Sequence, residues 1–255
     1  IANASRRIKK SEHDRCVAND VGDILEVQFG VDGVALAEAN RGPRFQLTKR
    51  DIYLALAATP GGRPNTARTW RDVNASLPDI PIQAMGPPST SGTRDALVEL
   101  ILEPGCAEVE PNAHALKAAT DHAPYDRLCK RIRDDGAYID KGENVNLIVQ
   151  GLAQNPNAIG VFGYSYLAEN EDRLHGVPID GVAPSYETIA HGLYPGARPL
   201  YLYVKTRHLR AVPGLSDFLS LYTSMWGPDG RLVKRGLIAA PDAVRAHALA
   251  IVQRR

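Results

Sequence analysis

Segments with the pattern of a strand alternate with segments with the pattern of a helix along the whole chain. Apolar and polar side chains alternate in residues 23–30, and β-branched and aromatic residues fill 198–205, so both are predicted strands. Residues 143–157 repeat apolar side chains at helical spacing and stop at Asn155–Pro156. This alternation predicts an α/β fold with a largely parallel sheet. The extended segments 30–39 and 198–205 are predicted to be two crossings of a hinge between lobes.

Capping residues and an apolar stripe predict further helices. Ser11 with Asp14, and Thr48 with Asp51, show the spacing of a capped helix start. Apolar residues in segment 214–227 recur at helical spacing, which is typical of a face in the protein core. The residues of this predicted core face are Leu215, Phe218, Leu219, Tyr222 and Trp226.

The composition excludes several classes of partner. The chain has 255 residues, 44% of them hydrophobic, and a formal net charge of +1. This balance argues against bulk electrostatic attraction to nucleic acid or to acidic membranes. No stretch approaches the roughly 20 apolar residues of a membrane span. The first ten residues, IANASRRIKK, are basic with no apolar run after them, so they are not a secretory signal.

Cysteine and histidine spacing predicts no metal site. The chain has no C-x-x-C, H-x-H or H-E-x-x-H motif, and no metal or cofactor is expected. Cys106 and Cys129 are separated by a helix-like segment and are able to pair, which leaves Cys16 over. The alternative is three unrelated buried thiols in a cytosolic protein, which composition alone favours.

Residues 86–102, GPPSTSGTRDALVELIL, lead from rigid prolines through small hydroxyl residues into a helix-patterned run. The first N–H groups of a helix have no partner within it, and the macrodipole adds positive charge there. Ser91, Gly92 and Thr93 stand at this start, and Arg94 adds a charged fork, so the group suits phosphate or sulfate. The alternative is an ordinary capped helix with Arg94 in water, which the stretch alone favours. Neither a P-loop nor a nucleophile elbow surrounds Ser91.

Several segments, taken in order, resemble bacterial phosphate-binding proteins, the extracytoplasmic receptors of the ABC phosphate importer. TSGTRDALVEL resembles the anion loop and helix of that family, and IANASRRIKKSEHDRC resembles the segment after its first strand–helix units. RIRDDGAYIDKGENVNLIVQGLAQNPNAIGVFGYSYL resembles a later segment, where a G-x-N loop precedes a helix and an AIG strand. RPLYLYVK and GPDGRLVKRGLI match the final lobe, so the resemblance covers nearly the whole chain.

The resemblance implies a two-lobed α/β fold like that of type II periplasmic binding proteins. In that family, mixed β-sheets are flanked by helices, the ligand cleft lies between the lobes, and two crossing strands form the hinge. Residues 1–36 and 199–255 would then form lobe I, without its N-terminal strand and helix. Residues 37–198 would form lobe II.

The resemblance also implies a set of phosphate ligands, namely Ser91, Gly92, Thr93, Arg94, Ser5, Arg6 and Asn144. Many family members use an arginine, and Arg94 is the candidate in this chain. Other members place the arginine four residues before the serine, where this chain has Pro87, so that variant is excluded. Asn144 lies in the G-x-N loop, where Val145 replaces an acidic residue that relatives often carry. No catalytic residue is implied.

Family members begin with a strand, a Ser/Thr-rich loop and a helix that supply further ligand donors. An aspartate next to the position of Ile1 accepts a hydrogen bond from protonated phosphate in the family. The expectation is that this segment and a signal peptide are missing from the chain. The resemblance implies a Cys106–Cys129 disulfide and a bond from Cys16 to a cysteine in the missing segment. It therefore implies a periplasmic or other extracytoplasmic location.

The predicted function is that of a monomeric receptor, not an enzyme, which binds inorganic phosphate and delivers it to ABC permease subunits. Two alternatives stay open. One is a receptor for another oxyanion, such as sulfate, molybdate or a phosphonate. The other is a phosphate-ester hydrolase with Ser91 as nucleophile, which needs a base and usually a metal. The sequence offers no motif for that base or metal.

Overall fold

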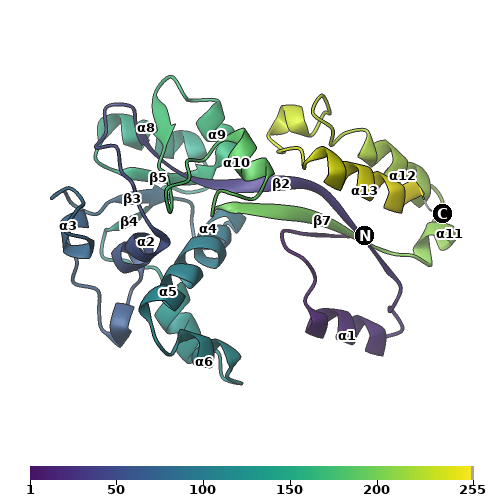
Figure 1. Cartoon of the computed structure of the whole chain (residues 1–255), viewed down its shortest axis with the longest axis horizontal. Helices are drawn as coiled ribbons and strands as arrows, with labels where there is room; N and C mark the ends of the chain where they lie inside the picture. The colour runs from purple at the N-terminus through teal and green to yellow at the C-terminus, as the bar shows by residue number, and fades with distance from the viewer. Residues whose placement is uncertain (254–255) are drawn as a thin grey trace. The chain divides into compact units, whose positions relative to one another are not determined.

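The computed structural model of the chain describes residues 1–253 and divides into two compact units (Figure 1). The first unit comprises Ile1–Gly33, Tyr186–Leu193 and the described residues from Ala197 onward. The second unit comprises Val34–Ser185 and Tyr194–Gly196.

The chain passes from the first unit to the second a few residues earlier than the predicted lobe boundary at 36/37. Residues 186–193, which the sequence places in lobe II, belong to the first unit. The reason is packing, because the side chain of Ile189 in α10 (Tyr186–Ala190) occupies the space where Gly33 lacks a Cβ. The backbone N–H of Ala239 also donates to the Tyr186 hydroxyl, at 3.1 Å.

The first unit is built on an antiparallel sheet of three strands. β7 (Ala197–Lys205) pairs with β1 (Ala2–Ala4) on one side and with the first part of β2 (Ile24–Ala39) on the other. The alternating side chains of 23–30 and the β-branched and aromatic residues of 198–205 thus lie in strands, as predicted. The strand prediction is local, because each residue type favours an extended backbone by its own shape.

Helices α12 (Leu215–Thr223) and α13 (Asp242–Gln253) pack against this sheet (Figure 1). Their apolar side chains join residues of β2 and β7 in one core, which includes Val27, Leu202, Val204, Leu215, Leu219, Trp226, Ala248 and Val252. The prediction for Phe218 was wrong, because its side chain is 46% exposed and stacks on Tyr222 at the edge of the core. The smaller elements of the unit are α1 (Lys10–Ala18), α11 (His208–Ala211) and a 3₁₀ turn at Val233–Arg235.

The second unit contains a mixed sheet. The last part of β2 pairs antiparallel with β5 (Ile159–Gly163) and β6 (Leu174–Gly176). β3 (Ala84–Gly86) pairs parallel with β5 and with β4 (Tyr138–Asp140). The prediction of a largely parallel sheet is therefore wrong. Parallel pairing needs a crossover connection, and only these three neighbouring strands follow such crossovers.

Helices flank this sheet. They are α2 (Lys49–Leu56), α3 (Trp70–Val73), α4 (Gly92–Leu97), α5 (Glu103–Val109), α6 (Ala113–Ala118), α7 (Ala123–Tyr125), α8 (Val145–Gln154) and α9 (Tyr164–Ala168). A 3₁₀ turn lies at Pro60–Gly62, and π-helical segments lie at Val98–Leu102 and Asp126–Lys130.

Thr48 caps α2 as predicted, since its side chain accepts from the Asp51 N–H and the Asp51 carboxylate accepts from the Thr48 N–H. The predicted Ser11 cap of α1 is wrong. That helix begins at Lys10, and Glu12 accepts a hydrogen bond from the Lys9 N–H at 2.9 Å.

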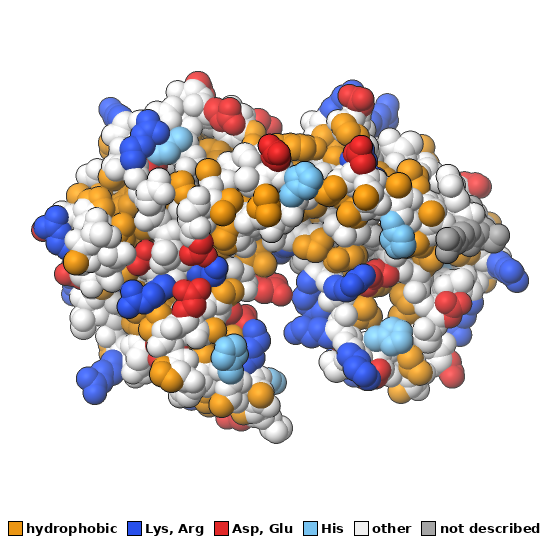
Figure 2. All heavy atoms as spheres, in the orientation of Figure 1, with side chains coloured by type: hydrophobic (Ala, Val, Ile, Leu, Met, Phe, Trp, Pro, Cys, Tyr) orange, Lys and Arg blue, Asp and Glu red, His pale blue; other side chains and the backbone are white. Residues whose placement is uncertain are grey.

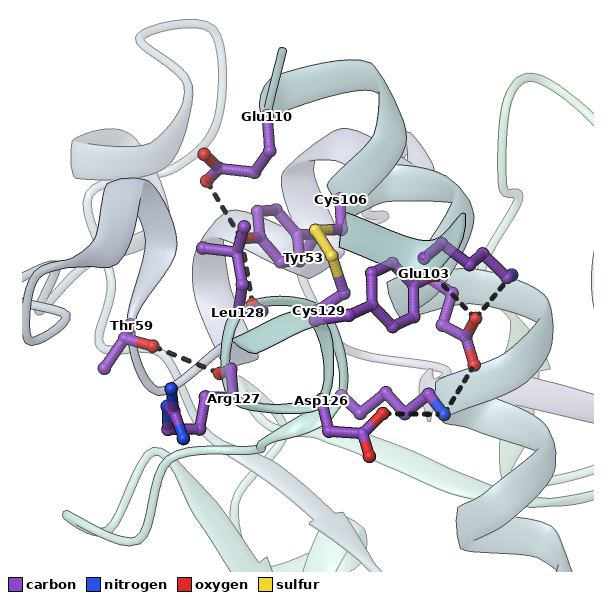
Figure 3. Close-up of a disulfide and its surroundings, with 12 residues drawn as sticks. Tyr53, Thr59, Glu103, Cys106, Glu110, Asp126, Arg127, Leu128 and Cys129 are labelled. Carbon is purple, nitrogen blue, oxygen red and sulfur yellow. Dashed lines mark hydrogen bonds and ion pairs between the residues drawn. A yellow bond between two sulfur atoms is a disulfide. The ribbon is translucent and has the colours of Figure 1, made fainter. Parts of the chain in front are cut away.

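A disulfide joins Cys106 of α5 to Cys129, with their Cα atoms 5.3 Å apart (Figure 3). The pairing implied by the resemblance is thereby confirmed. The hydroxyl of Tyr53 lies beside this bond, 2.9 Å from Glu110 Oε1 and 3.1 Å from the Leu128 carbonyl. Within residues 1–253, Cys16 has no disulfide partner, and its bond to another segment stays a prediction.

Acidic and basic side chains are interspersed over the second unit on the face drawn in Figure 2, in keeping with the near-zero net charge. Within residues 1–253, no helix has both the length and the apolar character that crossing a membrane requires.

Candidate functional site

Three parallel strands of the second unit each run into a helix. β3 leads to α4, β4 to α8 and β5 to α9. β3 lies between the other two strands, with Gly86 opposite Asp140 and Met85 opposite Gly160. Ligands of α/β sheets bind beyond the carboxyl ends of such strands, where helix N-termini meet. A binding site is therefore expected at this edge of the sheet.

Ser91 is the N-cap of α4. Its Oγ accepts a hydrogen bond from the Thr93 N–H at 3.3 Å, and its carbonyl accepts the first helical bond, from Asp95 N–H, at 3.1 Å. The side chain is held in place by burial, because Ser91 is only 7% exposed. The capping role considered as the alternative is thus present, and it also fixes the orientation of the loop.

The start of α4 leaves backbone donors free. Among the hydrogen bonds of residues 1–253, neither the Gly92 N–H nor the Arg94 N–H has an acceptor. Gly92 is exposed, and a Cβ at this position would meet no atom within 4 Å. Helical backbone continues from α4 through residues 98–102 into α5, so a long helix contributes its dipole to these donors. The arrangement suits a small anion.

Arg94 does not extend freely into water. Its guanidinium carbon lies 3.8 Å from the centre of the Tyr138 ring, and Nη1 donates to the Pro87 carbonyl at 3.3 Å. The Tyr138 hydroxyl donates to the same carbonyl at 2.8 Å. Burial raises the pKa of Tyr138, while the positive charge of Arg94 acts in the opposite direction. The phenol therefore stays neutral at ordinary pH and keeps its proton for the Pro87 carbonyl.

Asn144 caps the neighbouring helix α8. Its side-chain oxygen accepts from the Asn146 N–H at 3.1 Å, and the residue is exposed. β4 carries Asn144 to the sheet edge where α4 begins, since Lys141 N–H donates to the Gly86 carbonyl at 2.9 Å. No hydrogen bond connects Asn144 to the α4 start in the described chain, so its part in binding stays a prediction.

Ser5 and Arg6 lie in the first unit, directly after β1. They line a cavity of about 350 Å³ together with Asn3, Ala4, Ile8, Glu12 and Tyr203. Arg6 is already engaged, because its guanidinium donates to both oxygens of Glu12 at 2.9 and 2.7 Å. This hydrogen bonding and the Lys9 N–H lower the pKa of Glu12 to about 2. A ligand anion at Arg6 has to share the guanidinium with this carboxylate.

Sequence reasoning missed Tyr138 and Glu12. The sequence could have predicted the role of Glu12, because a glutamate three residues after the residue that precedes a helix is typical of a capping box. Tyr138 carried no such signal, because its contact with Arg94 depends on the pairing of β3 with β4. No group of three or more His, Cys, Asp or Glu side chains suited to a metal ion occurs in the described part of the chain.

Comparison with known proteins places the chain among binding proteins. The family model described as "PBP superfamily domain" matches residues 1–225. The phosphate-binding protein PstS of Staphylococcus haemolyticus (strain JCSC1435) is 28% identical over 252 residues, which cover 95% of this chain and 66% of that protein. The structure of "a possible phosphate binding protein" from Planctomyces limnophilus DSM 3776 is 27% identical, with a TM-score of 0.75 over 98% of this chain and 78% of the other.

A more distant structure shows the same fold. The ABC-type phosphate transport receptor from Vibrio cholerae is 17% identical, with a TM-score of 0.62 over 93% of this chain and 78% of the other. The chain spans 66% of the length of the S. haemolyticus protein, slightly less than two thirds. The mixed α/β fold and the match to the family model over residues 1–225 agree, and the chain belongs to the PBP superfamily.

Proposed function

We propose that this chain is a receptor that binds inorganic phosphate and hands it to the permease of an ABC importer. The observation that carries the proposal is the α4 start, where the N–H groups of Gly92 and Arg94 are free and the Arg94 guanidinium lies next to them. The similarity to the phosphate-binding protein PstS of Staphylococcus haemolyticus supports phosphate as the anion.

The donor set fits a tetrahedral oxyanion. Backbone N–H groups, the Thr93 hydroxyl and the guanidinium supply hydrogen-bond donors from one short segment. A hydrogen bond to a charged group contributes about 1.5–3 kcal/mol, so a few such donors are enough for specific binding. Ser5, Arg6 and Asn144 belong to the proposal as further ligands. A division into two lobes also remains part of it, with the boundaries of the two compact units in place of the predicted 36/37 and 198/199.

The receptor is proposed to act outside the cytoplasm, as a monomer, and to perform no chemistry. The Cys106–Cys129 disulfide supports an oxidising compartment. Ser91 is a poor candidate nucleophile, because its Oγ accepts from a backbone N–H and no basic side chain is hydrogen-bonded to it within residues 1–253. Hydrolysis of a chromogenic phosphate ester that disappears in Ser91→Ala would contradict this part of the proposal.

The test is a titration of the ¹⁵N-labelled chain with inorganic phosphate, followed by two-dimensional NMR. We expect the amide signals of Gly92, Thr93 and Arg94 to move. Ser91→Ala combined with Thr93→Val is expected to weaken binding about 10-fold or more, because two hydroxyl groups at the anion are lost. Thr69→Ala is the matched control, since it removes the N-cap of α3 and should leave phosphate affinity unchanged.

A folded spectrum with no response at millimolar phosphate would overturn the proposal. Titrations with sulfate, molybdate and a phosphonate distinguish phosphate from the other oxyanions. Tighter binding of any of these than of phosphate would replace phosphate as the proposed ligand while leaving the α4 start as the site.

A further inference from the structure

Tyr138 connects two parts of the candidate site. Its hydroxyl donates to the Pro87 carbonyl at 2.8 Å, and its ring lies beneath the Arg94 guanidinium at 3.8 Å. Arg94 Nη1 donates to the same carbonyl at 3.3 Å. One residue of β4 therefore holds both the loop before α4 and the first charged side chain of α4.

The position of the ring depends on the neighbouring strand. Gly86 lies opposite Asp140 in the parallel pair, and a Cβ on Gly86 would collide with the Tyr138 hydroxyl. The absence of that carbon lets the phenol cross the end of β3 and reach the Pro87 carbonyl. Tyr138 is 7% exposed, so its ring is packed and offers a fixed surface. This is a rigid support built from two strands.

The stacking leaves the guanidinium able to bind. An arginine that stacks on an aromatic ring uses the face of its planar group, whereas its N–H donors point outward in the plane. The guanidinium of Arg94 donates through Nη1 to the Pro87 carbonyl, and it also hydrogen-bonds with the Tyr138 side chain. Its other in-plane donors remain for a ligand. A free arginine loses up to about 2 kcal/mol of side-chain entropy when it is immobilised, and a side chain that is already held loses less.

We infer that Tyr138 is a positioning residue of the anion site, which holds the Arg94 guanidinium flat at the start of α4 with its free N–H edge ready for an oxyanion. The inference rests on the proposed function, which supplies inorganic phosphate as the ligand. It goes beyond that function because Tyr138 itself touches no anion and acts through Arg94. Tyr138→Phe keeps the ring and loses the hydroxyl, and Tyr138→Leu loses both.

The first measurement needs no ligand. The Arg94 side-chain Nε–H signal should be shifted upfield by the Tyr138 ring in the unliganded protein. We expect this shift to persist in Tyr138→Phe and to disappear in Tyr138→Leu. A wild-type signal without an upfield shift, or one that does not change in Tyr138→Leu, would overturn the inference. This readout stands even if phosphate proves not to bind, so the two proposals fail separately.

The second measurement is phosphate affinity in a double-mutant cycle. Tyr138→Leu is expected to weaken phosphate binding about 3- to 10-fold in the wild-type background, the range that a cation–π contact supports. It should have no further effect in the Arg94→Ala background. An equal loss in both backgrounds would show that Tyr138 does not act through Arg94 and would overturn the inference.

Tyr125→Leu is the matched control for the loss of a buried tyrosine. Its ring lies near Lys117 and Lys130, and its hydroxyl donates to Glu103 at 2.7 Å, so it makes similar contacts in α7. Its loss should lower stability while leaving the Arg94 signal and phosphate affinity unchanged. If Tyr138→Leu does not fold, the Arg94 signal is measured in Tyr138→Phe instead. Loss of the Arg94 shift in folded Tyr138→Phe would contradict support by the ring.

Discussion

Arg6 donates hydrogen bonds to both carboxylate oxygens of Glu12, at 2.9 and 2.7 Å. The pair links the residues after β1 to the first turn of α1, because the Lys9 N–H also donates to Glu12 at 2.9 Å. Arg6 is one of the proposed phosphate ligands. Because the Arg6 guanidinium already binds the Glu12 carboxylate, the ionisation of Glu12 is the first property to test.

The pKa of Glu12 in the folded chain is about 2, compared with a usual value of 4.5, chiefly because of the hydrogen bonds from Arg6. The folded state thus binds fewer protons than the unfolded state between these values. The stabilisation is fully present above about pH 4.5 and is lost as the pH falls through about 2. Carboxyl ¹³C NMR should give this low midpoint, and Arg6→Ala should raise it. A wild-type midpoint near 4.5 would contradict the pair.

Removal of the Cys106–Cys129 disulfide should lower the free energy of unfolding by about 3 kcal/mol, because the bond closes a loop with a sequence separation of 23. The variant is Cys106→Ala with Cys129→Ala, and urea denaturation measures the change. Cys16→Ser is the control, since Cys16 forms no disulfide within the described chain and should change little. Coincident curves for wild type and the double variant would show that the bond does not stabilise the fold.

Glu38 is fully buried, and His175 lies 2.9 Å from its Oε1. The Phe45 N–H donates to the same oxygen at 2.7 Å. His175→Ala should cost about 2–4 kcal/mol of unfolding free energy, because it leaves a buried carboxylate with one partner fewer. Urea denaturation tests this, with exposed His114→Ala as control. Glu38→Gln should reduce the cost of His175→Ala, and a cost that stays the same would argue against coupling.

Two glycine substitutions should have opposite effects on stability. Gly86→Ala is expected to lower the free energy of unfolding by about 1–3 kcal/mol, because the added methyl displaces the Tyr138 hydroxyl. Gly92→Ala should be neutral or stabilising by about 0.5–1 kcal/mol, since the space around it is open and alanine favours helix. Thermal unfolding compares the two. Equal losses would show that contact with Tyr138 is not the cause.

Local sequence patterns predicted many of the elements. The helical spacing of Ile148, Val149 and Leu152 predicted the buried face of α8, and Asn155–Pro156 its end. Thr48 with Asp51 predicted the start of α2. These features depend on residues within a turn or two of one another, so backbone geometry alone is enough to determine them.

Other predictions failed where distant segments compete. Ser11 was predicted to cap α1, but the helix begins earlier, at Lys10, where the Glu12 carboxylate accepts from the Lys9 N–H and from the distant Arg6. Phe218 has the correct spacing for a core face but lies at the edge of the stripe, where no element covers it fully. Parallel pairing was overestimated because the direction of a strand depends on its connections.

The sequence by itself determined the positions of several helices and strands, the small hydroxyl residues that begin α4 and the order of segments that marks the superfamily. Tertiary structure alone decided that β2 and β7 are antiparallel and that Arg94 lies on Tyr138. The physical reason is the sequence separation of the interacting residues. Periodicity and capping act between neighbours in sequence, whereas these contacts join residues far apart in the chain, which only the packed sheet and helices bring together.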